Sequence, residues 1–332
     1  MLEMLEKPEP VALGVYGIGK HACRTILPAI AVSERVRLAG IASRDIEVLR
    51  AQSDFWECRA WPSLNEMLRE PEIDAVMVST PIHSHYSDGI AVLKAGKHLW
   101  SEKALACTFE ESEALVELSR REKLALCLSC PPLYHPQFKV LATLIREGQL
   151  GAIRSVSASF AFPLTKELGL KVNAGGALLD TGFYPLGVPT FLFDEEPVLE
   201  GGSAIGQDDN NTDLAGAALL RYPKLGIHHS AIWGYGSDYI NEIRIIGETG
   251  MVLASPAFSK PSHLPQGLEL RRQNITEIIP IDECNQFTQM LEDFALTLTS
   301  TDSQERLRKQ ALKHQRLVGS VQVMCGLSDR IL

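Results

Sequence analysis

The chain has 332 residues and a formal net charge of -9, with 45% hydrophobic and 22% charged residues. This length exceeds a single ordinary core and suits two domains of a globular protein. The acidic balance argues against binding nucleic acid or a membrane surface, because either partner needs a basic face. No apolar run is long enough to span a membrane, and the acidic, proline-containing N-terminus is unlike a secretory signal. We therefore expect a cytoplasmic protein with neither nucleic-acid nor membrane partners.

The predicted elements of the first third alternate between strand and helix. Apolar runs indicate the strands, and amphipathic stretches between them indicate the helices. Ser63 and Thr108 are suited to N-caps, and acids fill the first turn after Thr108. This order predicts an α/β domain with a doubly wound parallel sheet over residues 1–127. The expected strands are 11–16, 36–43, 74–79, 98–102 and 124–130, and the expected helices are 20–31, 84–95 and those that follow Ser63 and Thr108.

After Gly151 the hydrophobic pattern changes to alternation with period two, which predicts antiparallel strands. A helical segment near 177–193 interrupts them, and helical spacing returns from Phe287 to Leu298. We expect an α+β domain over residues 128–332, with a mostly antiparallel open sheet and helices on one face. A last helix, at about 303–325, could pack back on the first domain. The expected strands include 153–162, 213–222, 226–233 and 240–247.

Cysteines and histidines give no sign of a metal site. Seven cysteines is an odd number in a chain without an export signal, so a disulfide framework is not expected. Cys127 and Cys130 form a C-x-x-C pair on an apolar run, but no second pair completes a zinc site. We interpret both as buried strand residues. His228 and His229 are adjacent on a strand and point to opposite faces, so they cannot share one ion.

A glycine-rich turn follows the first strand, in the segment VALGVYGIGKHA at 11–22. Gly17, Gly19 and Ala22 fill the three positions of G-x-G-x-x-G/A. Such a turn lets backbone N–H groups and the positive end of a helix approach a pyrophosphate closely. It predicts a dinucleotide site, although glycine turns also end strands for structural reasons alone. The residues expected to contact the dinucleotide here are Gly17, Ile18, Gly19, Lys20 and Ala22.

The end of the second strand determines which dinucleotide is expected. An acid at this place binds the ribose hydroxyls of NAD, whereas a Ser-Arg pair suits the 2′-phosphate of NADP. Ser43 and Arg44 occupy it, and Asp45 follows directly. Charge complementarity to phosphate favours NADP, and NAD is possible if the strand ends one residue later.

Residues after the later strands of the first domain are also cofactor candidates. In open α/β sheets, ligands bind beyond the carboxyl ends of the strands. His83 or His85 could be catalytic, but His85 could equally cap or pack the next helix. The further residues expected to contact the cofactor are Ser79, Thr80, Pro81, His85 and Glu102.

Three segments give the chain a resemblance to a known family. They are the glycine turn, SEKALA at 101–106 and AGGALLDTGFYPL at 174–186. In this order they resemble the glucose-fructose oxidoreductase/inositol dehydrogenase (Gfo/Idh/MocA) family. The chain is most similar to NADP-dependent sugar-nucleotide 3-ketoreductases, through IASR at 41–44 and YHPQ at 134–137. The resemblance implies a homodimer or homotetramer that assembles through the second sheet.

The resemblance also implies a catalytic group of Lys103, Asp180 and Tyr184. Lys103 belongs to the family signature E-K-P and is expected to face nicotinamide and substrate. Ala104 replaces the usual proline, so we expect Lys103 to be held less rigidly. Asp180 and Tyr184 are four residues apart on an expected helix and share one face. Tyr184 would protonate a ketone, and because tyrosine titrates at about pH 10, we expect Lys103 to lower its pKa.

The substrate itself is less well defined by the sequence. The loop at 163–173 lacks the arginine expected near a nucleotide diphosphate, for which Lys166 or Lys171 could substitute. We predict reduction of a ketone on a sugar or sugar nucleotide. The alternatives are an NAD-dependent cyclitol or sugar-alcohol dehydrogenase that uses Asp45, and a non-catalytic dinucleotide sensor or scaffold. Core packing is the alternative role for His135, and sheet packing for Tyr235. The residues expected to contact substrate are Lys103, Tyr134, His135, Asp180, Tyr184 and Tyr235.

Overall fold

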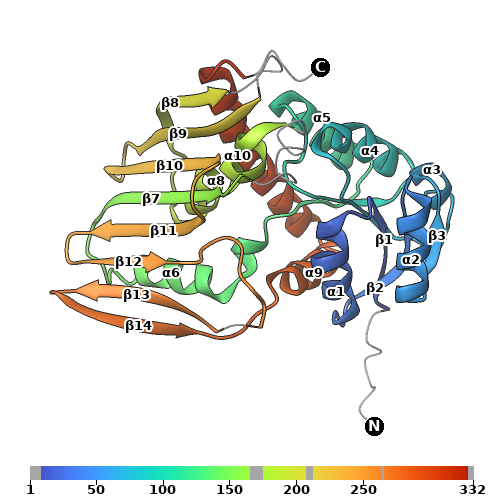
Figure 1. Ribbon diagram of the computed structural model, residues 1–332, viewed down its shortest axis with the longest axis horizontal. Coiled ribbons are helices and arrows are strands. Elements are labelled where there is room, and N and C mark those ends of the chain that lie inside the picture. The colour runs from blue at the N-terminus through green and yellow to red at the C-terminus, as the bar shows by residue number, and fades with distance from the viewer. Residues whose placement is uncertain (1–8, 165–174, 207–211, 264, 328–332) are drawn as a thin grey trace, which may run out of the picture.

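The computed structural model describes residues 9–164, 175–206, 212–263 and 265–327. Its first sheet is parallel, has six strands and follows the order β3-β2-β1-β4-β5-β6 (Figure 1). The central strand β4 is fully buried, as expected for a parallel sheet covered on both faces. The strands are β1 (Val11–Tyr16), β2 (Val36–Ala42), β3 (Arg59–Trp61), β4 (Ala75–Val78), β5 (His98–Ser101) and β6 (Leu126–Leu128).

Side-chain caps begin three of the helices described between these strands. Asp45, Ser63 and Thr108 each accept a hydrogen bond from a backbone N–H three residues later. Thr108 forms a full capping box with Glu111. The helix after the glycine turn contains a π-helical stretch. The helical elements are η1 (Ala22–Ile26), α1 (Leu27–Ala31), α2 (Ile46–Trp56), α3 (Leu64–Met67), α4 (Ile82–Lys94) and α5 (Phe109–Arg121).

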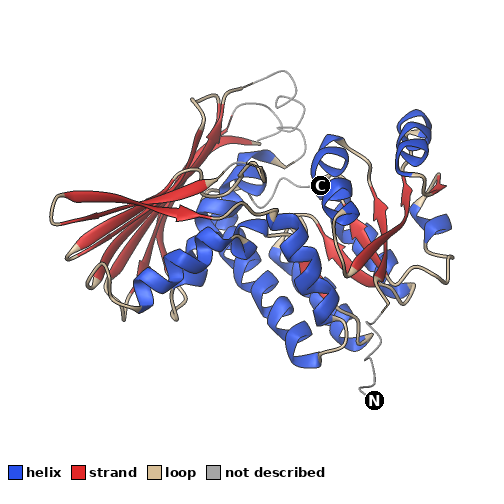
Figure 2. Cartoon of the chain, turned by 90° about the horizontal axis from the view of Figure 1, so that it is seen from below, coloured by secondary structure: helices blue, strands red, loops and turns tan. Residues whose placement is uncertain are grey.

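The second sheet has eight strands in the order β14-β13-β12-β11-β7-β10-β9-β8. Only the β7–β10 pair among its strands is parallel. Helices gather on one face of this sheet (Figure 2). Both fold classes predicted from the sequence are therefore confirmed. The strands are β7 (Ile153–Phe162), β8 (Val198–Gly206), β9 (Asp213–Tyr222), β10 (Ile227–Tyr235), β11 (Ile240–Gly247), β12 (Gly250–Ala254), β13 (Gln266–Arg272) and β14 (Ile275–Ile281).

The remaining helical elements lie between the two sheets. The long helix α10 contacts α5 and β6 of the half that contains the six-stranded sheet. It also contacts α8 and β8 of the half that contains the eight-stranded sheet. One continuous apolar core includes residues of both layers, among them Leu126, Phe183 and Trp233. These elements are η2 (Pro131–Tyr134), α6 (Pro136–Arg146), η3 (Leu178–Gly182), α8 (Phe183–Gly187), η4 (Val188–Leu192), α9 (Gln286–Thr297) and α10 (Thr301–Met324).

Several elements carried too little pattern to be predicted. β3 has three residues, two of them exposed, and β8 and β14 are edge strands with many exposed positions. Helices α2 and α6 and the strands β12 and β13 were also missed. Cys127 and Cys130 are buried free thiols, as expected. Within the described ranges, no helix is long and apolar enough to cross a membrane.

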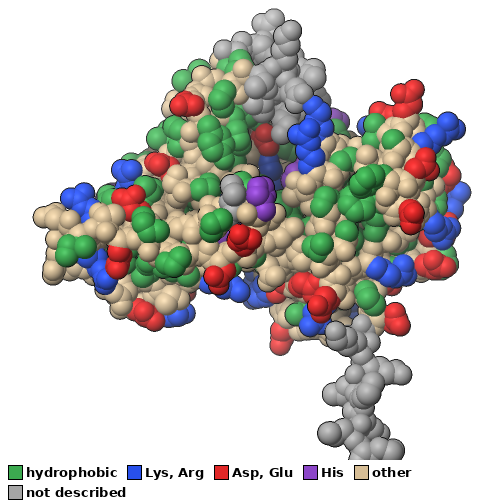
Figure 3. Space-filling model, turned by 60° about the horizontal axis from the view of Figure 1, so that its bottom comes forward, with side chains coloured by type: hydrophobic (Ala, Val, Ile, Leu, Met, Phe, Trp, Pro, Cys, Tyr) green, Lys and Arg blue, Asp and Glu red, His purple; other side chains and the backbone are tan. Residues whose placement is uncertain are grey.

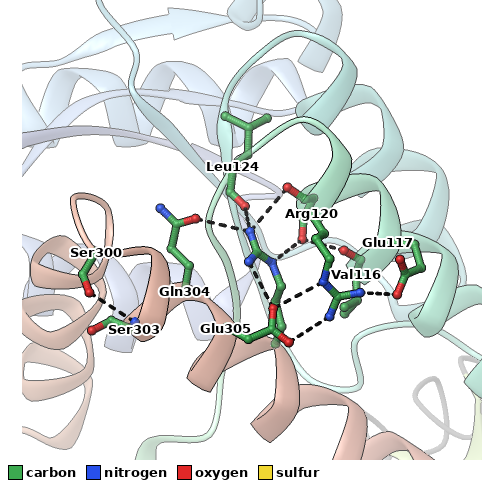
Figure 4. Close-up of polar contacts among 10 residues, drawn as sticks. Val116, Glu117, Arg120, Leu124, Ser300, Ser303, Gln304 and Glu305 are labelled. Carbon is green, nitrogen blue, oxygen red and sulfur yellow. Dashed lines mark hydrogen bonds and ion pairs between the residues drawn. The ribbon is translucent and has the colours of Figure 1, made fainter.

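Polar side chains hold α10 against the half of the molecule that contains the six-stranded sheet. Arg308 is 3% exposed, and its guanidinium donates to the Ser119 hydroxyl at 3.0 Å and to the Leu124 carbonyl at 2.7 Å. Arg120 of α5 pairs with Glu305 of α10 at 3.0 Å (Figure 4). The buried arginine satisfies acceptors that would otherwise lack a donor, whereas the Arg120 pair is accessible to water.

Replacing Arg308 by methionine should lower the free energy of unfolding by about 2 kcal/mol, because buried acceptors lose their donor. Urea unfolding measures this loss. The matched control is Arg120→Met, which breaks a half-exposed ion pair and should cost less than about 1 kcal/mol. Equal losses in the two variants would contradict the assignment of Arg308 as the buried anchor.

Candidate active site

A cleft of about 1100 Å³ lies between the strand ends of the first sheet and residues of the eight-stranded half of the molecule. Charged and histidine side chains gather where the two halves of the molecule meet (Figure 3). The carboxyl ends of β1, β2, β4 and β5 open into this cleft, as expected for an open α/β sheet. The predicted residues that line it are Gly17, Ile18, Gly19, Ser43, Arg44, Ser79, Thr80, Pro81, His85, Glu102, Lys103, Asp180 and Tyr184.

The glycine turn brings two backbone segments together and leaves space above them. Gly17 has a φ of 94°, and a Cβ on it would lie 2.7 Å from backbone atoms of Ser79 and Thr80. A Cβ on Gly19 would meet no atom within 4 Å. Gly17 is therefore required by the fold, whereas Gly19 keeps open a space that a pyrophosphate could fill.

Two of the residues predicted to contact the dinucleotide do not line the cleft. Ala22 is fully buried beneath the turn, where a small side chain allows close packing of helix and strand. Lys20 is exposed at the start of the helix. Neither side chain is among those facing the cleft, so contact at these two positions is limited to what the backbone can provide.

The end of β2 presents both Arg44 and Asp45 to the cleft, and one oxygen of the Asp45 carboxylate also caps α2. The Ser43 hydroxyl accepts from the Asp45 backbone N–H at 3.1 Å. The Asp45 carboxylate accepts from the Val48 N–H at 3.1 Å and so caps α2. Arg44 is exposed and forms no hydrogen bond or ion pair with the described part of the chain. The geometry at this end favours an anionic group of a ligand.

His85 joins two loops at the floor of the cleft. Its buried ring lies 2.7 Å from the Ala104 carbonyl oxygen through Nδ1 and 2.8 Å from the Thr80 oxygen through Nε2. Burial lowers the pKa of His85, while these hydrogen bonds and the charge of Glu102 act against the shift. The bridge holds the segment after Lys103, whose peptide bond to Ala104 is cis.

Glu102 is an ionised carboxylate in a buried position. Burial acts to raise its pKa, but His21, Ser129 and Lys103 outweigh it, so the pKa of Glu102 lies below its usual value. The Ser129 hydroxyl donates to it at 2.9 Å, and His21 Nε2 lies 3.5 Å away. The residue thus supplies fixed negative charge beside Lys103.

Lys103 and Asp180 form the central pair of the site. The Lys103 ammonium, 12% exposed, donates to the Asp180 carbonyl at 2.7 Å and also to its carboxylate. The Tyr235 hydroxyl donates to the other carboxylate oxygen at 2.6 Å. Burial and the Asp180 charge raise the pKa of Tyr235, so it remains a neutral donor. Asp180 is therefore held from two sides, and Tyr235 lies behind it rather than along the cleft wall.

Tyr184 presents a neutral phenol to the cleft. Its ring packs edge-on against Phe160 at 5.3 Å between centroids, and the Lys103 ammonium lies 5.4 Å from the ring centroid. Its hydroxyl has no hydrogen bond with the described residues. Burial, followed by the charges of Glu102 and Asp180, raises the pKa of Tyr184 well above 10. The expectation that Lys103 lowers this pKa is wrong here, because the ammonium is paired with Asp180.

Two buried histidines hold the backbone on either side of Tyr184. His314 Nε2 donates to the Phe183 carbonyl at 2.6 Å, and its ring stacks on Phe183 with centroids 3.6 Å apart. His229 Nε2 donates to the Pro185 carbonyl at 2.9 Å. Burial lowers the pKa of each histidine to about 4, so both are neutral near pH 7. The Tyr184 turn is fixed by fully buried donors from β10 and α10.

The start of the same helical segment is fixed in a similar way. The Asp213 carboxylate accepts from the Leu178 N–H at 2.8 Å and from the Trp233 indole at 2.9 Å. His229, Trp233 and Tyr235 all point inward from β10, because alternate strand residues share one face. Sequence reasoning did not give His229, Trp233 or Asp213 a role at the site. The period-two pattern identified their common face but not what it contacts.

Tyr134 and His135 lie outside the cleft, contrary to the expectation that they contact substrate. Tyr134 donates to the Asp293 carboxylate at 3.4 Å. His135 is buried and caps α6, with Nδ1 accepting from the Gln137 N–H at 3.1 Å. Burial lowers the pKa of His135 to about 4. Both residues therefore have structural roles where the two halves of the molecule meet. Lys166 and Lys171 lie outside the described residues.

Comparison with known proteins identifies the family. Residues 11–129 match the model of the oxidoreductase family with an NAD-binding Rossmann fold. Residues 138–253 match the GFO/IDH/MocA C-terminal domain. The chain belongs to the Gfo/Idh/MocA oxidoreductase family. The resemblance seen in the three sequence segments is thereby confirmed.

Several members of the family are similar over most of their length. The dTDP-3,4-didehydro-2,6-dideoxy-alpha-D-glucose 3-reductase of Streptomyces violaceoruber is 29% identical over 293 residues, 87% of this chain and 86% of that protein. The NADP-dependent D-xylose 1-dehydrogenase of Hypocrea jecorina is 29% identical, over 71% and 69% of the two chains. KijD10, a 3-ketoreductase from Actinomadura kijaniata solved with NADP and TDP-benzene, superposes with a TM-score of 0.91 at 26% identity, covering 96% of this chain and 98% of that one.

Two glycine variants should separate folding from ligand binding in this member of the family. Gly19→Ala should leave thermal unfolding unchanged, because a Cβ meets open space, yet weaken dinucleotide binding about tenfold or more by occupying the space a pyrophosphate needs. Gly17→Ala should lower thermal stability as well, through strain at positive φ and collision with Ser79. Nicotinamide fluorescence and thermal melts measure the two effects. Undiminished binding by Gly19→Ala would contradict the assigned pyrophosphate position.

Proposed function

We propose that this protein is an NADP(H)-dependent oxidoreductase that reduces a ketone on a sugar or sugar nucleotide. The observation that carries the proposal is the Tyr184 hydroxyl, a neutral phenol in the cleft without a hydrogen-bond partner in the described chain. It lies on the same cleft as Lys103, Asp180 and the glycine turn. The names of the 3-reductase relatives and of KijD10 support a keto-sugar substrate.

The cofactor site is assigned to residues from three strand ends. The turn at Gly17 and Gly19 would receive the pyrophosphate, and Ser43 with Arg44 would receive a 2′-phosphate. The open space at Gly19 and the Arg44 guanidinium, which has no ion pair with the described residues, both fit an anionic dinucleotide. When bound, the nicotinamide supplies a hydride. NADP in the solved KijD10 complexes supports this choice.

Tyr184 would donate the proton to the ketone oxygen. Its raised pKa keeps the phenol protonated near neutral pH. A general acid must be in this state at the start of a reduction. The reverse reaction needs a phenolate, which burial and the nearby carboxylates disfavour. Lys103 and Asp180 would orient the carbonyl and the phenol, since each is held by part-buried hydrogen bonds.

The alternative functions have less support. An NAD-dependent alcohol dehydrogenase would bind the ribose hydroxyls through the acid at the end of β2; Asp45 lines the cleft, but one of its carboxylate oxygens caps α2 and Arg44 lies beside it. A non-catalytic sensor was suggested by Ala104 in place of proline. Lys103 nevertheless lines the cleft and is hydrogen-bonded to Asp180, which favours an enzyme.

We also infer that two or four copies of the chain assemble through the eight-stranded sheet. Helices lie on one face of this sheet (Figure 2). Apolar side chains of several of its strands are exposed, and such surfaces are typical of contacts between protein chains. Size-exclusion chromatography with light scattering tests the inference. The exposed apolar residues are Val198, Ile205, Leu219, Ile232 and Ile246.

Replacing Tyr184 by phenylalanine should reduce kcat for ketone reduction by about 10²-fold or more, because the general acid is lost. NADPH affinity, measured by fluorescence, should be unchanged. Tyr134→Phe removes a hydroxyl outside the cleft and is the matched control, with kcat close to wild type. Wild-type turnover in Tyr184→Phe would exclude this residue as the proton donor.

Replacing Arg44 by alanine should weaken NADPH binding by about 10- to 100-fold, the range expected for losing a charged hydrogen bond. NADH binding should change little, because NADH has no 2′-phosphate. Asp45→Asn is the control, since asparagine also caps helices and should leave the preference for NADPH intact. A wild-type preference for NADH would contradict the cofactor assignment.

A further inference from the structure

One wall of the cleft is the loop between β12 and β13. The cleft-lining residues of this loop include Ser259, Lys260, Ser262 and His263. The loop begins close to the catalytic group, because the Phe258 ring lies 5.8 Å from the Tyr184 ring, measured between centroids. Residues just beyond Phe258 are therefore near the place assigned to the reacting sugar.

Buried side chains hold this wall in position. Asn241 of β11 accepts from the N–H groups of Ala257 at 3.0 Å and Phe258 at 2.7 Å. Its amide nitrogen donates to the Ser259 carbonyl at 2.9 Å. Gln286 at the start of α9 donates to the Phe258 carbonyl at 3.2 Å. The loop is thus preorganised by hydrogen bonds from two separate elements.

Lys260 lacks a carboxylate partner within the described part of the chain. It is partly buried, and its ammonium donates to the Ala257 carbonyl. It forms no ion pair with any residue that the structure describes. Burial lowers the pKa of Lys260 to about 7, with Cys284 acting in the opposite direction. A buried ammonium without a counter-ion is unfavourable, and an anion bound beside it would offset this penalty.

The other lysine and arginine side chains that line the cleft have different positions. Lys103 is paired with Asp180, and Arg44 lies at the end of β2, where the 2′-phosphate is assigned. Arg24 belongs to the helix that follows the glycine turn. Lys260 alone among these four comes from the eight-stranded half of the molecule. It is the cation on the substrate side of the cleft.

We propose that Lys260, with the hydroxyls of Ser259 and Ser262, binds the diphosphate of a sugar-nucleotide substrate. The inference rests on the proposed function and specifies its substrate class. Ammonium and hydroxyl donors on a fixed loop suit phosphate oxygens. Relatives named for dTDP-sugars and the KijD10 complex with TDP-benzene support a diphosphate in this family. Lys260 would thus supply the cationic side chain expected near the diphosphate, in place of the arginine that the loop at 163–173 lacks.

The test is calorimetric titration of the NADP-saturated protein with dTDP, a readout that does not depend on turnover. Lys260→Met should weaken dTDP binding about tenfold or more, whereas Lys260→Arg should retain most of it because the charge remains. Lys139→Met is the matched control, since Lys139 is an exposed lysine near Cys284 that does not line the cleft. Thermal melts of each variant check that the fold is intact.

Three results would overturn the proposal. Unchanged dTDP affinity in Lys260→Met would remove Lys260 from the site. Weaker NADPH binding with unchanged dTDP binding would assign Lys260 to the cofactor instead. A wild-type protein that does not bind dTDP would exclude a nucleotide diphosphate at this loop. Ketone reduction would then be tested separately, by comparing the turnover of wild type and of Tyr184→Phe on keto-sugars that carry no nucleotide.

Discussion

The Lys103 ammonium connects the two halves of the molecule at the site where they meet. It leaves the end of the parallel sheet and binds both the carbonyl and the carboxylate of Asp180, 77 residues further along the chain. This contact fixes the distance between the sheet that carries the glycine turn and the helical segment that carries Tyr184. In such a buried location a lone ammonium or a lone carboxylate would be costly, so each charge requires the other.

The pairing has an electrostatic consequence for Tyr184. Because Lys103 neutralises Asp180, it is not available to stabilise a phenolate, and the surrounding carboxylates and burial keep the phenol protonated. A site with this balance is suited to giving a proton rather than taking one. The two neutral histidines fix the backbone of the same segment without adding charge, and the Asp213–Trp233 contact holds its start. Rigid support and a fixed protonation state therefore arise from the same buried network.

The anchoring network comes largely from strand β10, whose alternate residues face the helical segment. His229 and Tyr235 donate directly to Pro185 and Asp180 of this segment. Trp233 donates to Asp213 of β9, which accepts from the Leu178 N–H. None of these contacts is local in sequence, and each involves a residue type that is also common in ordinary cores. The sequence could place these residues on one strand face, but no local signal distinguishes an anchor of the site from a packed core residue.

The amino-acid sequence by itself determined the parallel and antiparallel sheets, the capped helices α3 and α5, the glycine turn and the family motifs around Lys103 and Tyr184. These features depend on backbone geometry, hydrophobic period and capping, which a few neighbouring residues determine. Tertiary structure decided the rest. It turned Tyr134 and His135 away from the cleft, committed Asp45 to a helix cap, raised rather than lowered the pKa of Tyr184, and brought Lys260 to the cleft wall. Burial and the pairing of charges depend on segments far apart in the chain, so their effects become visible only when those segments are packed together.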